Sequence, residues 1–189
     1  MRRVCRSTDI RAGFVQWYET IFELIDLRSF SNLWYWIALA VMWSSASHWV
    51  IGVPYDLVTR VRRQGYGAQA ALDLEHLVQI NVRRLLYIAE ISGLWLVGSV
   101  CFILTVLLLL GFVYNVEFAQ AVFLLAFPMT LVSAITLRAA HRIEGARPDV
   151  TVLCKWLLWH RMKIQGIGMV SIFVTAMWGM WQNMHLGAF

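Results

Sequence analysis

The side chains with the clearest capacity for chemistry gather in the segment WSSASHW, residues 43–49, which lies inside a long apolar run. Ser44, Ser47 and His48 are spaced i, i+3 and i+4, so they share one face of a helix. A neutral imidazole that faces a cavity can ligate haem or chlorophyll. The same polar face can instead line a water-filled path, or hold one helix against another.

Small residues favour the packing interpretation. Extending the face by four residues reaches Gly52, and a similar stripe recurs in the last apolar segment. Small side chains at four-residue steps let helices approach closely, and hydroxyls bond across the contact or back to the i−4 carbonyl. We therefore predict helix packing at two sets of positions: Ser44, Ser47, His48 and Gly52 in the first segment, and Gly168, Ser171, Thr175 and Gly179 in the last.

The other candidate ligands are two histidines at the ends of apolar segments. His141 and His160 lie on the same side of the membrane as His48 in the topology predicted below, so the three are the candidates for cofactor binding. Each is also typical of an interfacial residue. Their spacing with Cys154 matches no structural zinc pattern, and the three cysteines form no C-x-x-C pair. The chain also lacks the common hydrolase, metalloprotease and nucleotide-binding motifs. We predict no catalytic residue, no cofactor and no metal site.

Composition indicates an integral membrane protein, because 60% of the 189 residues are hydrophobic. A membrane-spanning helix needs about 20 mostly apolar residues. Four segments satisfy this requirement, and Glu117, at a rim, is their only Asp, Glu, Lys or Arg; they are approximately 33–53, 93–113, 116–137 and 164–184. The predicted fold is all-α: a four-helix transmembrane bundle forming one domain, 33–189, after an amphipathic N-terminal segment, 1–32.

Two long connections, 54–92 and 138–163, are predicted to extend the bundle as helices outside the membrane. In the first, apolar residues recur at three- and four-residue steps, as in an amphipathic helix. Such a face needs a covering surface. We predict that a partner docks on it through Leu74, Leu77, Val78 and Leu85.

Positive charge sets the predicted orientation. The two long connections hold eleven of the sixteen Lys and Arg residues, and the N-terminal segment holds the other five. The positive-inside rule then places both connections in the cytoplasm and both termini in the periplasm. A re-entrant first segment would instead bring the N-terminus inside. The formal charge of +5 fits an anionic lipid surface, and we predict no nucleic-acid binding.

Two phrases, LIDLRSFSNLWYWIALAVMWSSASHWV and GMVSIFVTAMWGMWQN, resemble an uncharacterised family of small four-span membrane proteins from photosynthetic and related alphaproteobacteria. Members are sometimes labelled a component of the Suf iron–sulfur assembly complex. The resemblance covers most of the chain from about residue 17. It implies a bacterial inner membrane as the location, and it carries no catalytic residues.

These patterns predict a non-catalytic accessory or scaffold subunit of an inner-membrane protein complex. Its expected partners are membrane lipid and either another membrane protein or a second copy of the chain. The alternative is a small transporter or channel with a polar path around Ser44, Ser47 and His48. Transport usually requires an ionisable group inside the bilayer, and the predicted spans offer only His48. The subunit hypothesis is therefore preferred.

Overall fold

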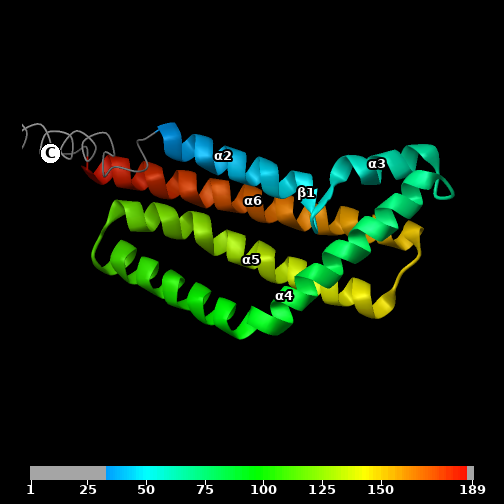
Figure 1. Ribbon diagram of the computed structural model, residues 1–189. Helices are drawn as coiled ribbons and strands as arrows, with labels where there is room; N and C mark the ends of the chain where they lie inside the picture. The colour runs from blue at the N-terminus through cyan, green and yellow to red at the C-terminus, as the bar shows by residue number, and fades with distance from the viewer. Residues whose placement is uncertain (1–32, 187–189) are drawn as a thin grey trace, which may run out of the picture.

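The computed structural model describes residues 33–186, and the predicted amphipathic segment, 1–32, lies outside this range. Helices dominate the described chain, which confirms the all-α prediction (Figure 1). In chain order the elements are α2 (Leu33–His48), β1 (Trp49–Val50), β2 (Val53–Pro54), α3 (Tyr55–Gln64), α4 (Gln69–Leu108), the π-helical η2 (Leu109–Val113), α5 (Glu117–Ala146) and α6 (Val150–Leu186).

Within residues 33–186, three helices are long and apolar enough to cross a membrane. They are α4 continued by η2 (Gln69–Val113), α5, and α6 up to Met184. Figure 1 shows α5 and α6 running side by side in opposite directions, with α2 along the other side of α6. The predicted continuity of each long connection with its apolar span is also observed, because α4, α5 and α6 each run unbroken from the connection into the apolar segment.

The first predicted span differs from the other three. Within residues 33–53, α2 has 16 residues and ends at His48. At 1.5 Å per residue it is about 24 Å long, which is shorter than the hydrocarbon core of about 30 Å. The helix ends because the chain enters a tight hairpin, a turn that the apolar composition of this segment did not reveal.

The hairpin holds Gly52 away from the α2 helix. Val50 pairs with Val53, and both intervening residues have positive φ, 53° at Ile51 and 72° at Gly52. Positive φ at both central residues is the requirement of a type I′ turn, and it is strained for a β-branched side chain. Asn81 on α4 secures the turn by donating from Nδ2 to the Gly52 carbonyl at 3.2 Å. The prediction that Gly52 continues the helical face of Ser44 and His48 is therefore wrong.

The largest hydrophobic core lies around the two long connections, not among the apolar spans. It joins the hairpin and α3 to the first part of α4, the end of α5 and the start of α6. Leu74 and Val78 are fully buried there, and Leu77 and Leu85 pack against the same cluster. The prediction that this face docks a partner is therefore wrong. The chain covers the face itself, because it turns after Gly65, between α3 and α4, and Val58 and Val61 of α3 join the same core.

The apolar halves of the helices pack more loosely. A second, smaller core joins Leu39 and Trp43 of α2 to Val132 of α5 and Ile164 of α6. No residue from Ile91 to Leu110, in α4 and the start of η2, is buried by the described chain. Such looseness is expected where lipid replaces water, since lipid chains are as apolar as the side chains and provide no hydrophobic drive for association.

Both long connections lie at the same end of the bundle. Figure 1 places α3, the start of α4 and the α5–α6 connection at one end, and the turn before α5 and the last turns of α6 at the other. We call the former the basic end, since it holds the eleven cations of segments 54–92 and 138–163.

Candidate functional site

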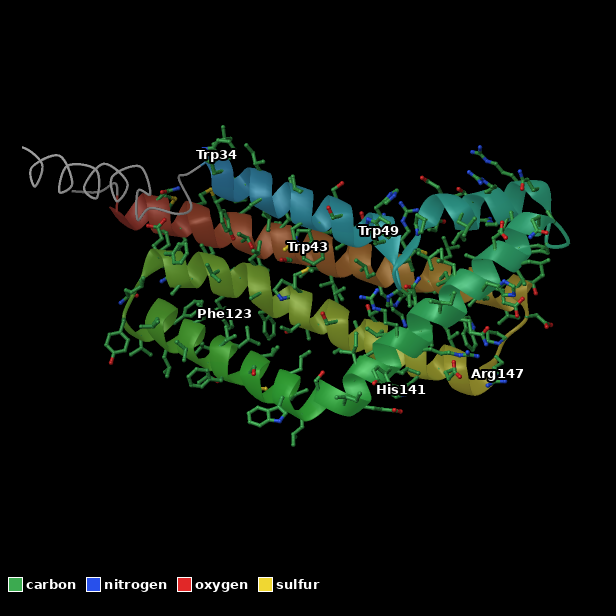
Figure 2. The ribbon with its side chains drawn as sticks, viewed as in Figure 1. Trp34, Trp43, Trp49, Phe123, His141 and Arg147 are labelled. Atoms are coloured by element: carbon green, nitrogen blue, oxygen red, sulfur yellow. The ribbon has the colours of Figure 1, made fainter. Side chains whose placement is uncertain are left out.

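The surface that α2 presents to the bundle is apolar and aromatic. Leu39 and Trp43, four residues apart, are buried against Val132 and Ile164. Opposite Trp43, α6 has Gly168, where an added Cβ would come within 2.8 Å of the indole Cε3 atom. Trp43 thus fills a notch that only glycine provides, at the place where α2 meets α6 (Figure 2).

The polar residues of α2 do not form this contact. Ser44 and His48 are exposed, and Ser47 is half-buried with its hydroxyl donating to the Ser44 carbonyl at 3.0 Å. Ser44 and His48 are rotated away from the face that carries Leu39 and Trp43, whereas Ser47, four residues after Trp43, lies at the half-buried end of that face. The packing prediction is therefore corrected for α2: within this chain the buried area comes from its apolar face, and the polar face points outward.

The small residues predicted in the last apolar segment are all buried. Gly168 receives Trp43, and Ser171, Thr175 and Gly179 follow at three- and four-residue steps along the same part of α6. This stripe lies where α2 runs beside α6 (Figure 1). The close approach therefore places glycine on α6 and a large ring on α2, without a matching small-residue face on α2.

The three candidate histidines occupy different environments. His48 is exposed on α2 next to the Trp49 ring, and His141 is exposed on α5. His160 on α6 is buried, and its Nε2 lies 3.2 Å from the hydroxyl of Thr136. That hydroxyl donates its one hydrogen to the Val132 carbonyl at 2.7 Å, so it must accept from His160 Nε2–H. His160 therefore joins α6 to α5.

Nothing in residues 33–186 brings these histidines together with other ligands. Across that range, no group of three or more His, Cys, Asp or Glu side chains is placed to hold a metal ion. Cys154 is buried in the core at the basic end, whereas Cys101 is exposed on the apolar part of α4.

One polar cluster was not predicted from the sequence, because its members are uncharged and lie far apart along the chain. Gln120, in the first turns of α5, is 1% exposed. Its Nε2 donates to the Gly111 carbonyl in η2 at 2.8 Å, and its Oε1 accepts from Trp178 Nε1 at 3.0 Å and from Gln182 Nε2 at 2.7 Å. Gln120 is the only amide side chain in segment 116–137, and this was the available signal. It joins α4, α5 and α6 at the end opposite the basic end.

A second missed feature is a basic cavity of about 680 Å³ between α5 and α6 at the basic end. In the sequence, its cations indicated only the orientation of the chain in the membrane. Ile51 of the hairpin forms part of its wall, and its polar and aromatic lining consists of Arg138 and Arg142 from α5 and Trp156, Trp159, His160 and Lys163 from α6. The Arg142 guanidinium lies 4.5 Å from the centroid of the Trp156 ring, a cation–π contact that positions the charge.

Positive charge in this cavity is not neutralised by residues 33–186. No Asp or Glu of that range lines it. Within the described residues, Arg138, Arg142 and Lys163 form no ion pair, in contrast to Arg147, which contacts Glu144 at 3.7 Å. Three unpaired cations around one hollow make it a candidate site for an anion.

A second cavity, of about 370 Å³, lies further along the same pair of helices and is almost wholly apolar. Leu124, Phe127, Pro128 and Leu131 line it from α5, and Gly166, Ile167, Val170, Ser171 and Val174 line it from α6. Gly166 has open space where a Cβ would stand, so its missing side chain helps to form the hollow.

Comparison with known proteins adds no assignment to these sites: no family model matches the chain, and neither the curated proteins nor the solved structures include a significant match.

Proposed function

We propose that the protein is a non-catalytic accessory or scaffold subunit of a membrane protein complex, which docks a transmembrane helix of a partner protein against the apolar half of α4. The observation that carries this proposal is the exposure of that half. No residue between Ile91 and Leu110 is buried by the described chain, although α4 is the most apolar of the three candidate spans.

The shape of this surface supports a helix as its occupant. Leu94 and Trp95 are 89% and 81% exposed. Together with Phe102 they surround Gly98 and Ser99 in a shallow cavity of about 410 Å³. A glycine and a serine between large side chains form a notch in which the backbone of a second helix fits closely. Lipid chains can cover the large side chains, but the notch favours a helix.

The proposed location is a bacterial inner membrane, with the basic end in the cytoplasm. Two findings support this orientation: both basic connections lie at one end of the bundle, and the positive-inside rule assigns such an end to the cytoplasm. The family resemblance described above supports the bacterial location. Membrane lipid is the other proposed partner.

The transport alternative receives no support from the position of its predicted path. Ser44 and His48 are exposed on the outer side of α2, opposite the face that packs on the bundle. A path through the bundle would require them to face inward. We therefore retain the subunit proposal alone.

Position-specific crosslinking tests the proposal. A photoreactive phenylalanine analogue replaces Trp95 or Ser99 on α4 in cells, with Phe173 and Met169 of α6, which are 65% and 69% exposed, as matched lipid-facing controls. We expect positions 95 and 99 to capture one defined protein that also co-purifies in native detergent and is identified by mass spectrometry. Gly98→Leu, which fills the notch, should abolish both results.

Two results would contradict the proposal. One is equal crosslinking from all four positions, which would indicate ordinary lipid exposure. The other is a chain that purifies alone as a monomer from native detergent, while Gly98→Leu changes neither its crosslinks nor its yield.

A further inference from the structure

The basic cavity and the apolar cavity lie in line along the same faces of α5 and α6, and together they are here called the α5–α6 groove. On α5, the lining of the two cavities continues from Arg138 through Ile135 to Leu131 at three- and four-residue steps, so it follows one helix face. On α6, Lys163 lines the first cavity, and Gly166 and Ile167 line the second. The two hollows are therefore about one helical turn apart on both helices.

The dimensions of this groove match one leaflet of a bilayer. Arg138 and Leu124 are fourteen residues apart on α5, which corresponds to about 21 Å along the helix axis. Half of the hydrocarbon core is about 15 Å thick, and the remaining length corresponds to the headgroup region. The basic cavity then lies at headgroup depth and the apolar cavity at acyl-chain depth.

The chemistry changes along the groove in the same direction. The basic cavity is surrounded by Arg138, Arg142 and Lys163, which have no ion-pair partner in the described chain. Trp156 and Trp159 lie beside these cations. Tryptophan is enriched at the level of lipid headgroups, and basic pockets between membrane helices suit anionic headgroups. In the lining of the apolar cavity, Ser171 provides the only polar side chain. A soluble anion would gain no favourable contact from this apolar cavity.

From this geometry we propose that the α5–α6 groove binds an anionic glycerophospholipid from the leaflet at the basic end. The phosphate lies among Arg138, Arg142 and Lys163, and one acyl chain follows Leu131, Gly166 and Val170 toward the middle of the membrane. Because the groove supplies three cations and no carboxylate, it selects a headgroup with net negative charge over a zwitterionic one. This proposal is independent of the α4 docking surface.

The test uses the full chain purified in detergent, with lipid binding measured by native mass spectrometry against phosphatidylglycerol, phosphatidylcholine and inorganic phosphate. We expect phosphatidylglycerol to bind in preference to phosphatidylcholine, and inorganic phosphate to compete weakly. Each cation near a membrane surface contributes about 5-fold to the binding of an anionic lipid, so Arg138→Gln with Arg142→Gln should weaken phosphatidylglycerol by about 30-fold. Lys155→Gln removes an exposed α6 cation that does not line the groove, and it serves as the matched control.

A second pair of variants tests the acyl-chain part of the groove. Gly166→Leu fills the apolar cavity, whereas Ala176→Leu adds a leucine at an exposed α6 position that does not line it. We expect the first variant to weaken phosphatidylglycerol binding and the second to leave it unchanged. Neither should change the binding of inorganic phosphate. This pair retains all the cations, so it provides a test even if the arginine variants do not fold.

Three outcomes would overturn the proposal. Equal binding of phosphatidylglycerol and phosphatidylcholine to the unmodified chain would exclude selection by charge. Equal losses in the Arg138–Arg142 variant and in Lys155→Gln would indicate non-specific attraction. Full competition by inorganic phosphate, together with no effect of Gly166→Leu, would identify a soluble anion as the ligand in place of a lipid.

Discussion

Replacement of Gln120 by methionine should destabilise the helical bundle more than any other single change of a polar residue in its apolar part. Methionine nearly conserves volume, so packing is retained while the three hydrogen bonds to Gly111, Trp178 and Gln182 are lost. Hydrogen bonds between membrane helices contribute about 0.6 kcal/mol on average and at most about 1.7 kcal/mol each. Three such bonds predict a loss of about 2 kcal/mol in the free energy of unfolding.

The assay is reversible unfolding in mixed micelles by titration with a denaturing detergent, followed by tryptophan fluorescence and helical circular dichroism. Two controls use the same chemical change. Gln182→Met removes one of the three bonds and should lose about 0.6 kcal/mol. Gln165→Met changes an exposed residue of α6 and should remain within about 0.5 kcal/mol of the unmodified protein.

The order of the three variants tests the reasoning. If Gln120→Met is no less stable than Gln165→Met, the Gln120 cluster does not hold the three helices together. If Gln182→Met is as damaging as Gln120→Met, the stabilisation resides in one bond and is not shared among α4, α5 and α6.

Three further predictions use matched pairs of substitutions. Gly168→Ala should lower the free energy of unfolding by about 1–3 kcal/mol, because the added Cβ would lie 2.8 Å from the Trp43 ring. Gly166→Ala places its Cβ in open space and should not destabilise the protein. Equal effects of the two variants in thermal unfolding would show that Trp43 does not require glycine at position 168. Leu74→Ala should lower the free energy of unfolding by about 2–5 kcal/mol, because Leu74 is fully buried. Leu72→Ala, at a position that is 51% exposed, should lower it by about 0.5 kcal/mol or less. A Leu74→Ala variant that is a stable monomer would support Leu74 as a docking residue. His48→Gln and His48→Leu should each remain within about 0.5 kcal/mol of the unmodified protein, with no Soret band, because His48 is exposed; a pigment lost on His48→Gln would instead identify a ligand site.

The prediction of helices rested on the length of each apolar segment. It was correct where that length is enough to determine the structure. The second, third and fourth apolar segments lie in helices long enough to cross a membrane, and these helices continue into the connections as expected. The first segment was misjudged because composition does not distinguish a helix from a hairpin. Gly52 was interpreted as a small packing residue, although its positive φ of 72° is what the turn requires.

The candidate site was harder to predict because polarity was used as the guide to packing. In a membrane helix, a serine can satisfy its hydroxyl on its own backbone, as Ser47 does on the Ser44 carbonyl. Ser47 therefore needs no second helix to satisfy its hydroxyl. The contact was instead determined by a glycine on one helix and a tryptophan on the other, a pairing between distant positions that periodicity within a single segment cannot show.

The division of the fold into two packing regimes explains why the groove lies between α5 and α6. At the basic end, burial of apolar surface from water is favourable, and the hairpin, α3 and α4 close over the ends of α5 and α6 into one core. Along the apolar spans this driving force is absent. There, specific contacts hold the helices together, among them Trp43 at Gly168 on one side and the Gln120 cluster at the far end. Between these contacts α5 and α6 leave the two cavities open, and the cations of the basic cavity, which have no ion-pair partner in the described residues, would give the proposed lipid site its preference for a negative headgroup.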